Sequence, residues 1–594
     1  MPPQGDPTHA EETKKGFPST FWAANLMEIF ERMAWYGFFT LSSLYITGSV
    51  EDGGLGLTSE QRGIIQGIVP FLLYLFPVVT GALADKFGFK RTFLVAYLIL
   101  TPSYWLLGRP GGFWGFFFVF LLVALGAAAF KPLVVGTVGH TTTEKNKAMG
   151  FGIFYMMVNI GGFAGPAVAG LVRNKLGWPW VFNMSAIWIG CNFIWLFLFY
   201  REPEGRTRAL EQEVAEAKRR LAATGPIARD VRKGPPQVMA AALRLFPSFI
   251  VAGFLLGWLP TAIALSLIVA LTVFLRLLVA AVPREVRLLL RKSGEDIVDV
   301  LGNGGFFIMA MGTILILMLA GGEWIGWLDC LILAAVLILG NMVFDAAYFR
   351  RKGYTEGLWQ PARVGDWRFA LYLLILAGFW AVYEQIFVTM PEYIRDYTNT
   401  HDILGWLAGA CGTLGLHGWA DGLRSAMASG YQINPEWLVN VDAGCIVAFQ
   451  VAISAVFARW KPFTTMIVGT IAASIGLAMN VYGEMGWMVV VSLMVFSFGE
   501  MMASPKSQEY VARIAPKAKT AMYMGYYFVA MALGYLFSGI LSGQLYGHYG
   551  RDVRDPDTLW LIFGGIGITS AAALMLYDRF VVRRASRAGR EARA

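Results

Sequence analysis

Residues 113–138 read FWGFFFVFLLVALGAAAFKPLVVGTV and hold a single charged residue, Lys131. A helix that crosses a bilayer needs about 20 apolar residues, so this stretch predicts a spanning helix. Similar runs recur along the 594 residues, of which 56% are hydrophobic and 15% charged. Soluble domains carry about 25% charged residues. The composition therefore excludes a soluble enzyme, a disordered chain and a fibrous protein, and predicts an all-α protein with many membrane spans.

The predicted spans fall into two sets of six. They are 18–47, 62–84, 92–108, 113–138, 148–173 and 178–200, followed by 367–390, 435–458, 463–483, 486–512, 519–546 and 558–578. Basic residues gather in the loops on one side, such as Lys90-Arg91, whereas Glu51-Asp52 and Glu484 lie on the other. Because basic loops stay inside, both termini are expected in the cytoplasm and the chain in the inner (plasma) membrane. Two sets of six spans with both ends inside is the layout of a major facilitator transporter, with two related bundles.

This layout divides the chain into five parts, and the first has no signal-peptide pattern. They are a cytoplasmic tail (1–17), a six-helix bundle (18–200), a linker (201–366), a second six-helix bundle (367–578) and a basic cytoplasmic tail (579–594).

The linker is expected to hold extra helices. We predict a cytoplasmic helix at 209–222 and a membrane hairpin within 304–346. The run 245–281 has basic flanks on both sides, so it predicts an even number of crossings or a short re-entrant hairpin. The total is then 14 or 16 spans. The segment 391–434 is expected to form a small external cap.

Cofactor chemistry has no support in the sequence. The four Cys and five His show no metal-ligand or disulfide spacing. The stretch 302–305 (GNGG) lacks the strand-and-helix context of a phosphate-binding loop. The net charge of +9 fits basic cytoplasmic loops better than nucleic-acid binding. We therefore expect no metal, no cofactor, no nucleic-acid partner and no enzyme activity, with the lipid bilayer as surroundings.

Ionisable residues inside the predicted spans are the first candidates for function. Placing one at mid-membrane costs at least about 2.5–3.5 kcal/mol on insertion scales. Glu28, Glu31 and Arg32 share one helical face, which suits a watery cavity better than lipid. Lys131 stands alone in its span. The alternative for any single charged residue is that it lies near a helix end and its side chain reaches the membrane interface, or that it forms a buried structural pair.

The second half contributes mainly acids. Glu384 lies in 367–390, Asp442 in 435–458, and Glu500 one turn before Ser504 in 486–512. Acids and bases from both halves are expected at a cavity between two rocking bundles. Protonation of Glu384 or Glu500 would release a pair with Lys131 and free the bundles to move. This favours proton coupling over sodium coupling, which commonly uses carbonyls of unwound helices.

Five motifs resemble the signatures of the proton-dependent oligopeptide transporters, the POT or PTR family. They occur in order and in the expected helices. EIFERMAWYG (28–37) resembles ExxERFxYYG, FYMMVNIGG (154–162) resembles FYxxINxGS, WAVYEQ (380–385) resembles FWxxxEQ, QINP (432–435) resembles QxNP and EMMASP (500–505) resembles ExxxSP. In addition, GALADKFGFKR (81–91) is similar to the general major facilitator loop between helices 2 and 3. The likeness covers roughly 20–200 and 370–580.

The resemblance implies a major facilitator fold and a symporter that imports di- and tripeptides with protons by alternating access. Bacterial members carry two extra helices between the halves, which suits 304–346, and we expect a monomer. The resemblance assigns proton coupling to Glu28, Glu31, Arg32, Lys131 and Glu384. It assigns substrate binding to Tyr36, Tyr74, Lys131, Asn159, Asn434, Glu500 and Ser504, with Lys131 at the peptide carboxylate and Glu500 and Asn434 at the amino end. It assigns conformational change to the loop of Gly81, Asp85 and Arg91.

Two departures from the family pattern concern the pocket. The family often carries an Arg where this chain has Phe39, and the family pattern is apolar or Pro where this chain has Asp442. Trp35 and Met33 also replace a Tyr and a Phe of the helix-1 signature. A missing base and an added acid shift the pocket toward negative potential.

Two other functions remain open. The same fold and coupling could serve an amino-acid derivative, nitrate or a peptide-like compound, and Phe39 is the motive for this hypothesis. A non-transporting receptor or scaffold could use 205–366 to engage a partner, although it would have no need for Glu384, Lys131 and Glu500 together.

The loss of a helix-1 cation predicts a weaker requirement for a free peptide carboxylate. Peptides with free and with amidated C-termini should compete almost equally for uptake, because Phe39 offers the carboxylate no charge. Competition of both forms against labelled dialanine measures this, and strict rejection of the amides would show the prediction to be wrong.

Overall fold

The structure, a computed structural model, describes residues 16–77, 80, 88–142, 146–203, 326, 332–333, 367–457, 459–514 and 520–583. Helices dominate these residues, and the β-structure among them is one isolated bridge between Asn399 and Met485. The expected linker 201–366 therefore lies outside the described residues except for six positions, and so do most of both predicted tails.

The first half is an antiparallel bundle whose helices match the predicted spans to within a few residues, except that α2 ends at Leu75, nine residues before the predicted end at 84. Its helices are α1 (Ser19–Thr47), α2 (Ser59–Leu75), α4 (Phe89–Leu107), α5 (Gly112–Thr141), α6 (Lys147–Leu176) and α7 (Trp178–Leu198). Their short connections force neighbouring helices to run in opposite directions. A cluster of buried aromatic and aliphatic side chains fills the space between them.

The second half repeats this arrangement with more interruptions. Its elements are α15 (Trp367–Tyr383), α16 (Gln385–Val388), α17 (Met390–Tyr397), α18 (His401–Thr413), α19 (His417–Ala428), α20 (Pro435–Val456), α21 (Pro462–Ala478), the 3₁₀ turn η3 (Met479–Tyr482), α22 (Gly486–Ile514), α23 (Thr520–Leu545), the π-helical η5 (Tyr546–Asp552), α24 (Pro556–Tyr577) and the π-helical η6 (Asp578–Val582). In the described part of the chain, nine helices are long and apolar enough to span a membrane.

Local sequence explains several helix starts. Thr58 and Gln61 form a capping box that begins α2 at Ser59, three residues before the predicted start of the span. Proline occupies the first turn of α7, α17, α20, α21 and α24. Its missing N–H has no helical partner at that position in any case. These helices therefore begin where the sequence places a proline.

The predicted span 367–390 is broken in the structure. α15 ends at Tyr383, and Glu384 stands at the break before α16 with φ −67° and ψ −9°. The helix then resumes as α17 and continues to Tyr397, beyond the predicted end. The break places an acidic residue at the junction of two helical segments, where irregular backbone in membrane transporters commonly lines a cavity.

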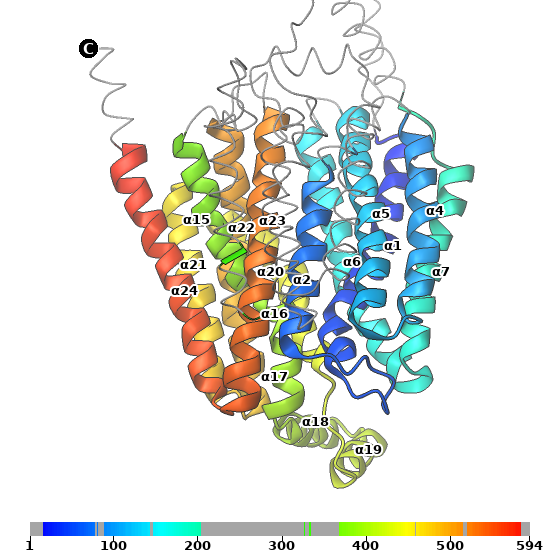
Figure 1. Cartoon of the computed structure of the whole chain (residues 1–594), viewed down its shortest axis with the longest axis vertical. Coiled ribbons are helices and arrows are strands. Elements are labelled where there is room, and N and C mark those ends of the chain that lie inside the picture. The colour runs from blue at the N-terminus through cyan, green and yellow to red at the C-terminus, as the bar shows by residue number, and fades with distance from the viewer. Residues whose placement is uncertain are drawn as a thin grey trace, which may run out of the picture.

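The predicted cap 391–434 begins with the end of α17 and continues as a hairpin of α18 and α19. Figure 1 shows this hairpin beyond the ends of the spanning helices. We call this side the hairpin face. The opposite side, where α1 begins and α24 ends, is the terminal face.

The two halves meet closely along α2 and α23 and along α6 and α20. Gly63 and Gly67 of α2 lie directly against Gly539 and Gly543 of α23. A Cβ atom on Gly63 would overlap the carbonyl oxygen of Gly539. Small residues allow two membrane helices to approach backbone to backbone, so these glycines set the spacing between the halves.

This close contact predicts that Gly63→Ala separates the halves at this point. Forcing an added methyl into a packed contact costs about 1–3 kcal/mol, and the thermal unfolding of purified protein should shift downward accordingly. Gly190→Ala in α7 is the matched control, because a Cβ there meets open space. An equal response of the two variants would contradict the proposed role of the α2–α23 contact.

Candidate functional site

The charged face of α1 forms a compact buried cluster. Arg32 Nε lies 3.3 Å from Glu28 Oε1 and donates to Glu31 Oε2 at 2.5 Å, and its NH2 also contacts Glu31. All three side chains are buried. Two carboxylates share one guanidinium, so the cluster keeps one surplus acid that can take a proton or a second cation.

Lys131 of α5 connects α1 to the second half of the protein. Its ammonium lies over the ring of Tyr74 in α2, 3.9 Å from the ring centroid. Tyr74 stacks on Tyr535 of α23 with the centroids 5.2 Å apart. Lys131 is also within electrostatic range of Glu28, Glu31 and Glu384. The cation is therefore held by an aromatic face and remains able to change carboxylate partners.

Glu384 lies at the helix break on the other side of this contact. Its side chain is buried, and neither carboxylate oxygen has a hydrogen bond within the described residues. The phenol of Tyr535 lies beside this carboxylate, and Lys131 is the cation that interacts with it electrostatically. Sequence reasoning missed Tyr535, because no charge or motif marks the apolar segment around it.

Phe39 fills the place at which the family often carries an Arg. It is fully buried and stacks on Trp35, with 5.0 Å between the centroids. Its ring is 6.0 Å from that of Tyr535 and 6.5 Å from that of Phe387. An aromatic cluster thus separates this part of α1 from the second half, and Glu384 has no helix-1 cation from this position.

Other predicted binding residues lie around the same interface. Tyr36 is half-buried, with Arg32 5.8 Å above its ring and Phe387 of α16 at 5.9 Å. Glu500 is buried and interacts electrostatically with both Tyr36 and Glu384. Asn159 is partly accessible and donates to the carbonyl of Tyr155 at 2.8 Å. The structure thus gathers the acids, Lys131 and the tyrosines from both halves.

Two other predicted residues lie away from this site in the described structure. Asn434 precedes α20 at the hairpin face, where its Nδ2 donates to Asn174 Oδ1 at 2.8 Å. Arg91 is exposed near the start of α4. Gly81 and Asp85 lie outside the described residues.

A buried ion pair, which the sequence analysis did not predict, joins the halves at the hairpin face. Arg62 Nε of α2 lies 2.9 Å from Glu392 Oε1 of α17, and both side chains are fully buried. Arg62 also donates to the Val388 carbonyl and to Ser542 at 2.5 and 2.9 Å. Arg62 is the first residue of the predicted span 62–84, and a charge at that position is typical of the flank of a membrane helix. Only its tertiary partner reveals its role.

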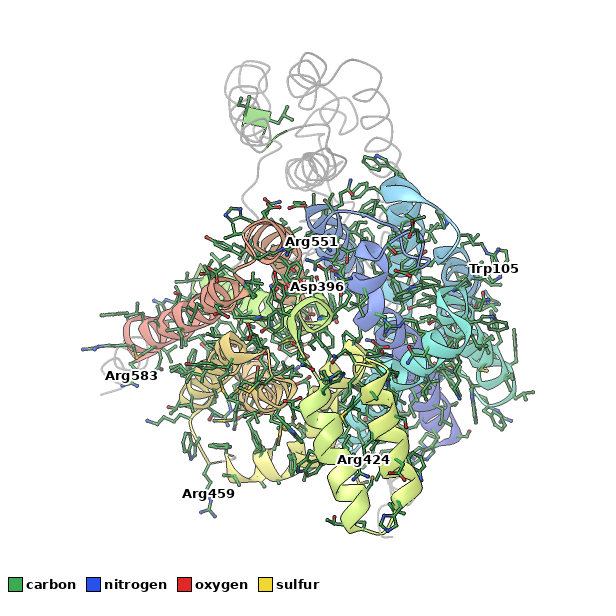
Figure 2. The ribbon with its side chains drawn as sticks, turned by 90° about the horizontal axis from the view of Figure 1, so that it is seen from below. Trp105, Asp396, Arg424, Arg459, Arg551 and Arg583 are labelled. Atoms are coloured by element: carbon green, nitrogen blue, oxygen red, sulfur yellow. The ribbon has the colours of Figure 1, made fainter. Side chains whose placement is uncertain are left out.

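Further polar contacts surround this pair. Arg551 lies 3.5 Å from Glu392 Oε2, and Tyr546 donates to Asp396 at 2.7 Å. Figure 2, seen from the hairpin face, shows Asp396 and Arg551 near the centre of the molecule. On α6 and α20, Arg173 contacts Glu436 at 3.3 Å. Two ion pairs between the halves, Arg62–Glu392 and Arg173–Glu436, therefore close this face.

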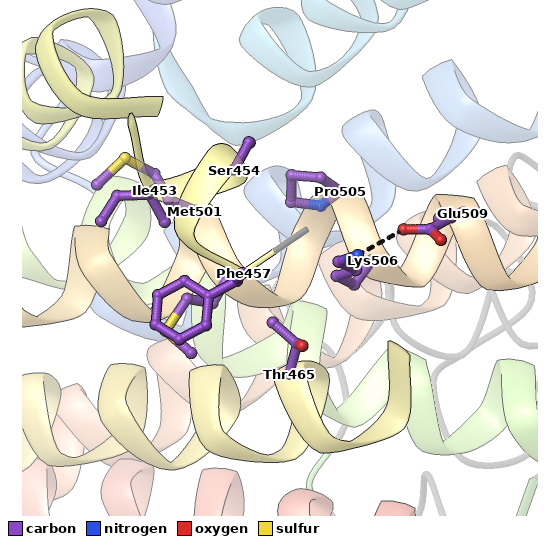
Figure 3. A pocket seen from close by; sticks show the side chains of 9 residues that line it. Ile453, Ser454, Phe457, Thr465, Met501, Pro505, Lys506 and Glu509 are labelled. Atoms are coloured by element: carbon purple, nitrogen blue, oxygen red, sulfur yellow. Dashed lines mark ion pairs between the residues drawn. The ribbon is translucent and has the colours of Figure 1, made fainter. Parts of the chain in front are cut away.

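A separate pocket of about 280 Å³ lies within the second half between α20, α21 and α22 (Figure 3). Its lining includes Phe457, Met501 and the Lys506–Glu509 ion pair, which spans 2.8 Å. None of the predicted site residues lines it. In the described residues, no group of three His, Cys, Asp or Glu is arranged to hold a metal ion.

The known proteins that this chain resembles are membrane transporters. Residues 25–344 and 426–594 match the family model of the Major Facilitator Superfamily. The chain is 22% identical to Peptide transporter YePEPT of Yersinia enterocolitica, over 89% of this chain and 88% of the relative. It is 29% identical to a di-/tripeptide transporter of Lactococcus lactis, over 30% of this chain and 37% of the relative.

Solved structures show the same fold. A POT family transporter in complex with 5-aminolevulinic acid aligns with a TM-score of 0.59 at 16% identity, over 95% of this chain and 97% of that one. Peptide transporter POT in complex with sulfate aligns with a TM-score of 0.58 at 18% identity, over 98% and 99%.

The chain therefore belongs to the Major Facilitator Superfamily, a family of multi-pass membrane transporters. Its relative of similar length is a peptide transporter, and its structural neighbours are POT family transporters, the family whose motifs its sequence resembles. The predicted all-α polytopic fold and the predicted superfamily are confirmed.

The buried pair at the hairpin face predicts that Glu392→Gln opens this face. The substitution leaves Arg62 buried without a counter-ion, and removing one partner of a buried pair costs about 3–5 kcal/mol. A cysteine placed at the fully buried Ser43 should then react faster with a membrane-impermeant maleimide.

Asp421→Asn is the control for this experiment, because its pair with Arg424 is exposed and such pairs contribute about 0–1 kcal/mol. The double variant Arg62→Leu/Glu392→Leu should restore slow labelling, since it leaves no buried charge unpaired; Arg551, which also contacts Glu392, is 36% exposed. Unchanged labelling in Glu392→Gln would show that the pair does not keep the hairpin face closed.

Proposed function

We propose that this protein is a proton-coupled symporter that imports di- and tripeptides by alternating access. The observation that carries the proposal is the contact series Lys131–Tyr74–Tyr535–Glu384, which joins a cation of one half to an acid of the other. The peptide transporters among its relatives support the substrate class.

The closed hairpin face corresponds to an inward-facing state in this proposal. We assign the hairpin face to the outside and the terminal face to the cytoplasm, in keeping with the basic loops. Outward opening then requires the halves to part at Arg62–Glu392 and Arg173–Glu436. Asn434 belongs to this closure and not to the peptide site, because it bonds Asn174 across the same interface. The protein acts as a monomer, since both halves of the site are in one chain.

Proton coupling follows from the surroundings of Glu384. Glu384 is buried and has no hydrogen bond within the described part of the chain. A buried carboxylate in that position is strongly disfavoured, so Glu384 is stable either as the neutral acid or when Lys131 approaches it. Protonation therefore switches off an attraction between the halves. Glu28, Glu31 and Arg32 offer Lys131 an alternative partner on its own side of the interface. Two competing partners for one cation give the two states that a coupled transporter needs.

The substrate is expected to lie between these groups with its ends oriented by charge. Lys131 faces the peptide carboxylate, Glu500 faces the amino end, and Tyr36, Tyr74 and Asn159 line the space between, with Ser504 supporting Glu500. The loop of Gly81, Asp85 and Arg91 serves conformational change.

A second candidate function keeps the fold and coupling but changes the substrate. Phe39 and its aromatic neighbours stand where the family often places a carboxylate-binding Arg. This favours a small amine-bearing compound with a weaker carboxylate requirement.

Uptake by purified protein in liposomes tests the proposal. With an inward proton gradient and a negative interior, wild type should accumulate labelled dialanine, and a protonophore should abolish accumulation. Well-folded protein without gradient-driven uptake of dialanine would make the second candidate the working hypothesis.

Two variants test the assigned roles. Glu384→Gln should lose proton-driven accumulation and keep counterflow exchange, because the amide mimics the protonated acid. Lys131→Ala should lose both. Glu509→Gln, near the terminal face, is the control and should behave as wild type. Loss of exchange in Glu384→Gln would move this residue from coupling to binding, and normal uptake in Lys131→Ala would contradict its role.

A further inference from the structure

Asp442 and Glu500 form a pair of facing carboxyl groups inside the second half. Asp442 lies in α20 and Glu500 in α22, and the two side chains are 3% and 5% exposed. The two carboxyl groups interact electrostatically with each other. Ser497 donates to Asp442 Oδ1 at 2.6 Å. Ser497 and Glu500 are one turn apart on the same face of α22, so this bond holds the Asp442 carboxyl group beside Glu500.

Within the described residues, no cation faces this pair. The titratable groups that face it are Tyr36 of α1, Tyr155 of α6, Tyr383 and Glu384 of the broken helix, Cys445 of α20 and Tyr527 of α23. None of these is a base. Arg32 and Lys131 interact instead with Glu28, Glu31 and, for Lys131, Glu384. Among the described residues, Asp442 and Glu500 are thus buried acids without a positive partner.

Glu500 also has an unused oxygen. Its Oε2 is buried and has no hydrogen-bond partner in the described part of the chain. The carboxyl group is close enough to Tyr36 and Tyr155 of the first half to interact with both. The unpartnered group therefore belongs to the interface between the halves, where the substrate is expected to bind.

Electroneutrality sets what this pair can hold. An uncompensated buried charge costs several kcal/mol, so each carboxyl group needs a proton or an external cation. Two carboxyl groups have room for two positive charges in any combination. A single acid at this place, as the family motif provides, has room for one. The second carboxyl is therefore useful for a ligand with two cationic groups.

We infer that the Asp442–Glu500 pair selects peptides whose first residue carries a side-chain cation, that is, lysyl, ornithyl or arginyl peptides. The α-ammonium group of the peptide pairs with Glu500, and the cation of the first side chain pairs with Asp442. Each arriving cation displaces one proton from the pair to water. This inference rests on the proposed function and narrows its substrate class.

The distribution of charge across the interface fits such a ligand. Glu384, Glu500 and Asp442 lie in the second half, whereas Arg32 and Lys131 lie in the first. A cationic first residue would face the acids and the peptide carboxylate would face Lys131. The replacement of an Arg by Phe39 leaves the acids free of competition from a protein cation at that position.

Binding of two matched peptides tests the inference. Lysyl-alanine and norleucyl-alanine have side chains of similar length and differ in the terminal ammonium. The full chain in lipid nanodiscs should bind lysyl-alanine about tenfold or more tightly, which is the value of a charge-assisted hydrogen bond. In Asp442→Asn the two affinities should become nearly equal. Asp421→Asn, on the exposed hairpin, should keep the wild-type ratio.

The pH dependence in wild type is a second measurement that needs no variant. Protons compete with the side-chain cation for the pair, so the ratio of the two affinities should rise as pH increases from mildly acidic to neutral. A structural role of Asp442 alone would leave this ratio constant.

The outcomes distinguish the proposed peptide transport from the inferred role of the Asp442–Glu500 pair. If norleucyl-alanine binds and lysine adds no affinity at any pH, the proposed function stands and the inference about the pair is overturned. The inference is also overturned if Asp442→Asn binds both peptides with the wild-type ratio. If neither peptide binds to folded protein, peptide transport fails together with it.

Discussion

A charge buried in an apolar bundle must have a partner, and this constraint organises the whole molecule. At the hairpin face the requirement is met within the protein, because Arg62 and Glu392 are fully buried against each other and Arg173 meets Glu436. At the centre it is met incompletely, since the oxygens of Glu384 have no hydrogen bond to any residue that the structure describes. Paired buried charges stabilise one conformation, whereas buried acids without a partner need a proton or a cationic ligand.

The aromatic residues at the centre decide which charges can meet. Phe39 and Trp35 fill the space beside Tyr535, so the route between the halves passes through Tyr74 and Tyr535 rather than through a direct ion pair. A cation held by an aromatic face is bound less firmly than one in a buried carboxylate pair. Lys131 can therefore exchange partners at a lower cost, which suits a site that must change state in every transport cycle.

The glycine contact between α2 and α23 supports both features. It brings the backbones of the two halves together and leaves no room for side chains there. The same proximity places Arg62 within reach of Ser542 and the Val388 carbonyl. The Arg62–Glu392 ion pair and the central aromatic stack thus both lie beside one close helix–helix contact.

The sequence by itself determined the fold and most of the charged residues of the site. Long apolar runs with few charges have few alternatives to membrane helices, and Glu28, Lys131, Glu384 and Glu500 stand out because a charge inside such a run is costly. The motifs then indicated the family. These are local signals, so they can be recognised without knowledge of the tertiary contacts.

Only the tertiary structure decided which residues are partners. Nothing local distinguishes Tyr535 from other aromatic residues, or Arg62 from a flanking charge, because their roles come from groups hundreds of residues away. The break at Glu384 and the position of Asn434 at the hairpin face also escaped the sequence. Asp442 was visible as an extra acid, but its pairing with Glu500 was not. Periodicity and composition report what one helix buries, whereas the packing of one half against the other determines which buried groups share a charge.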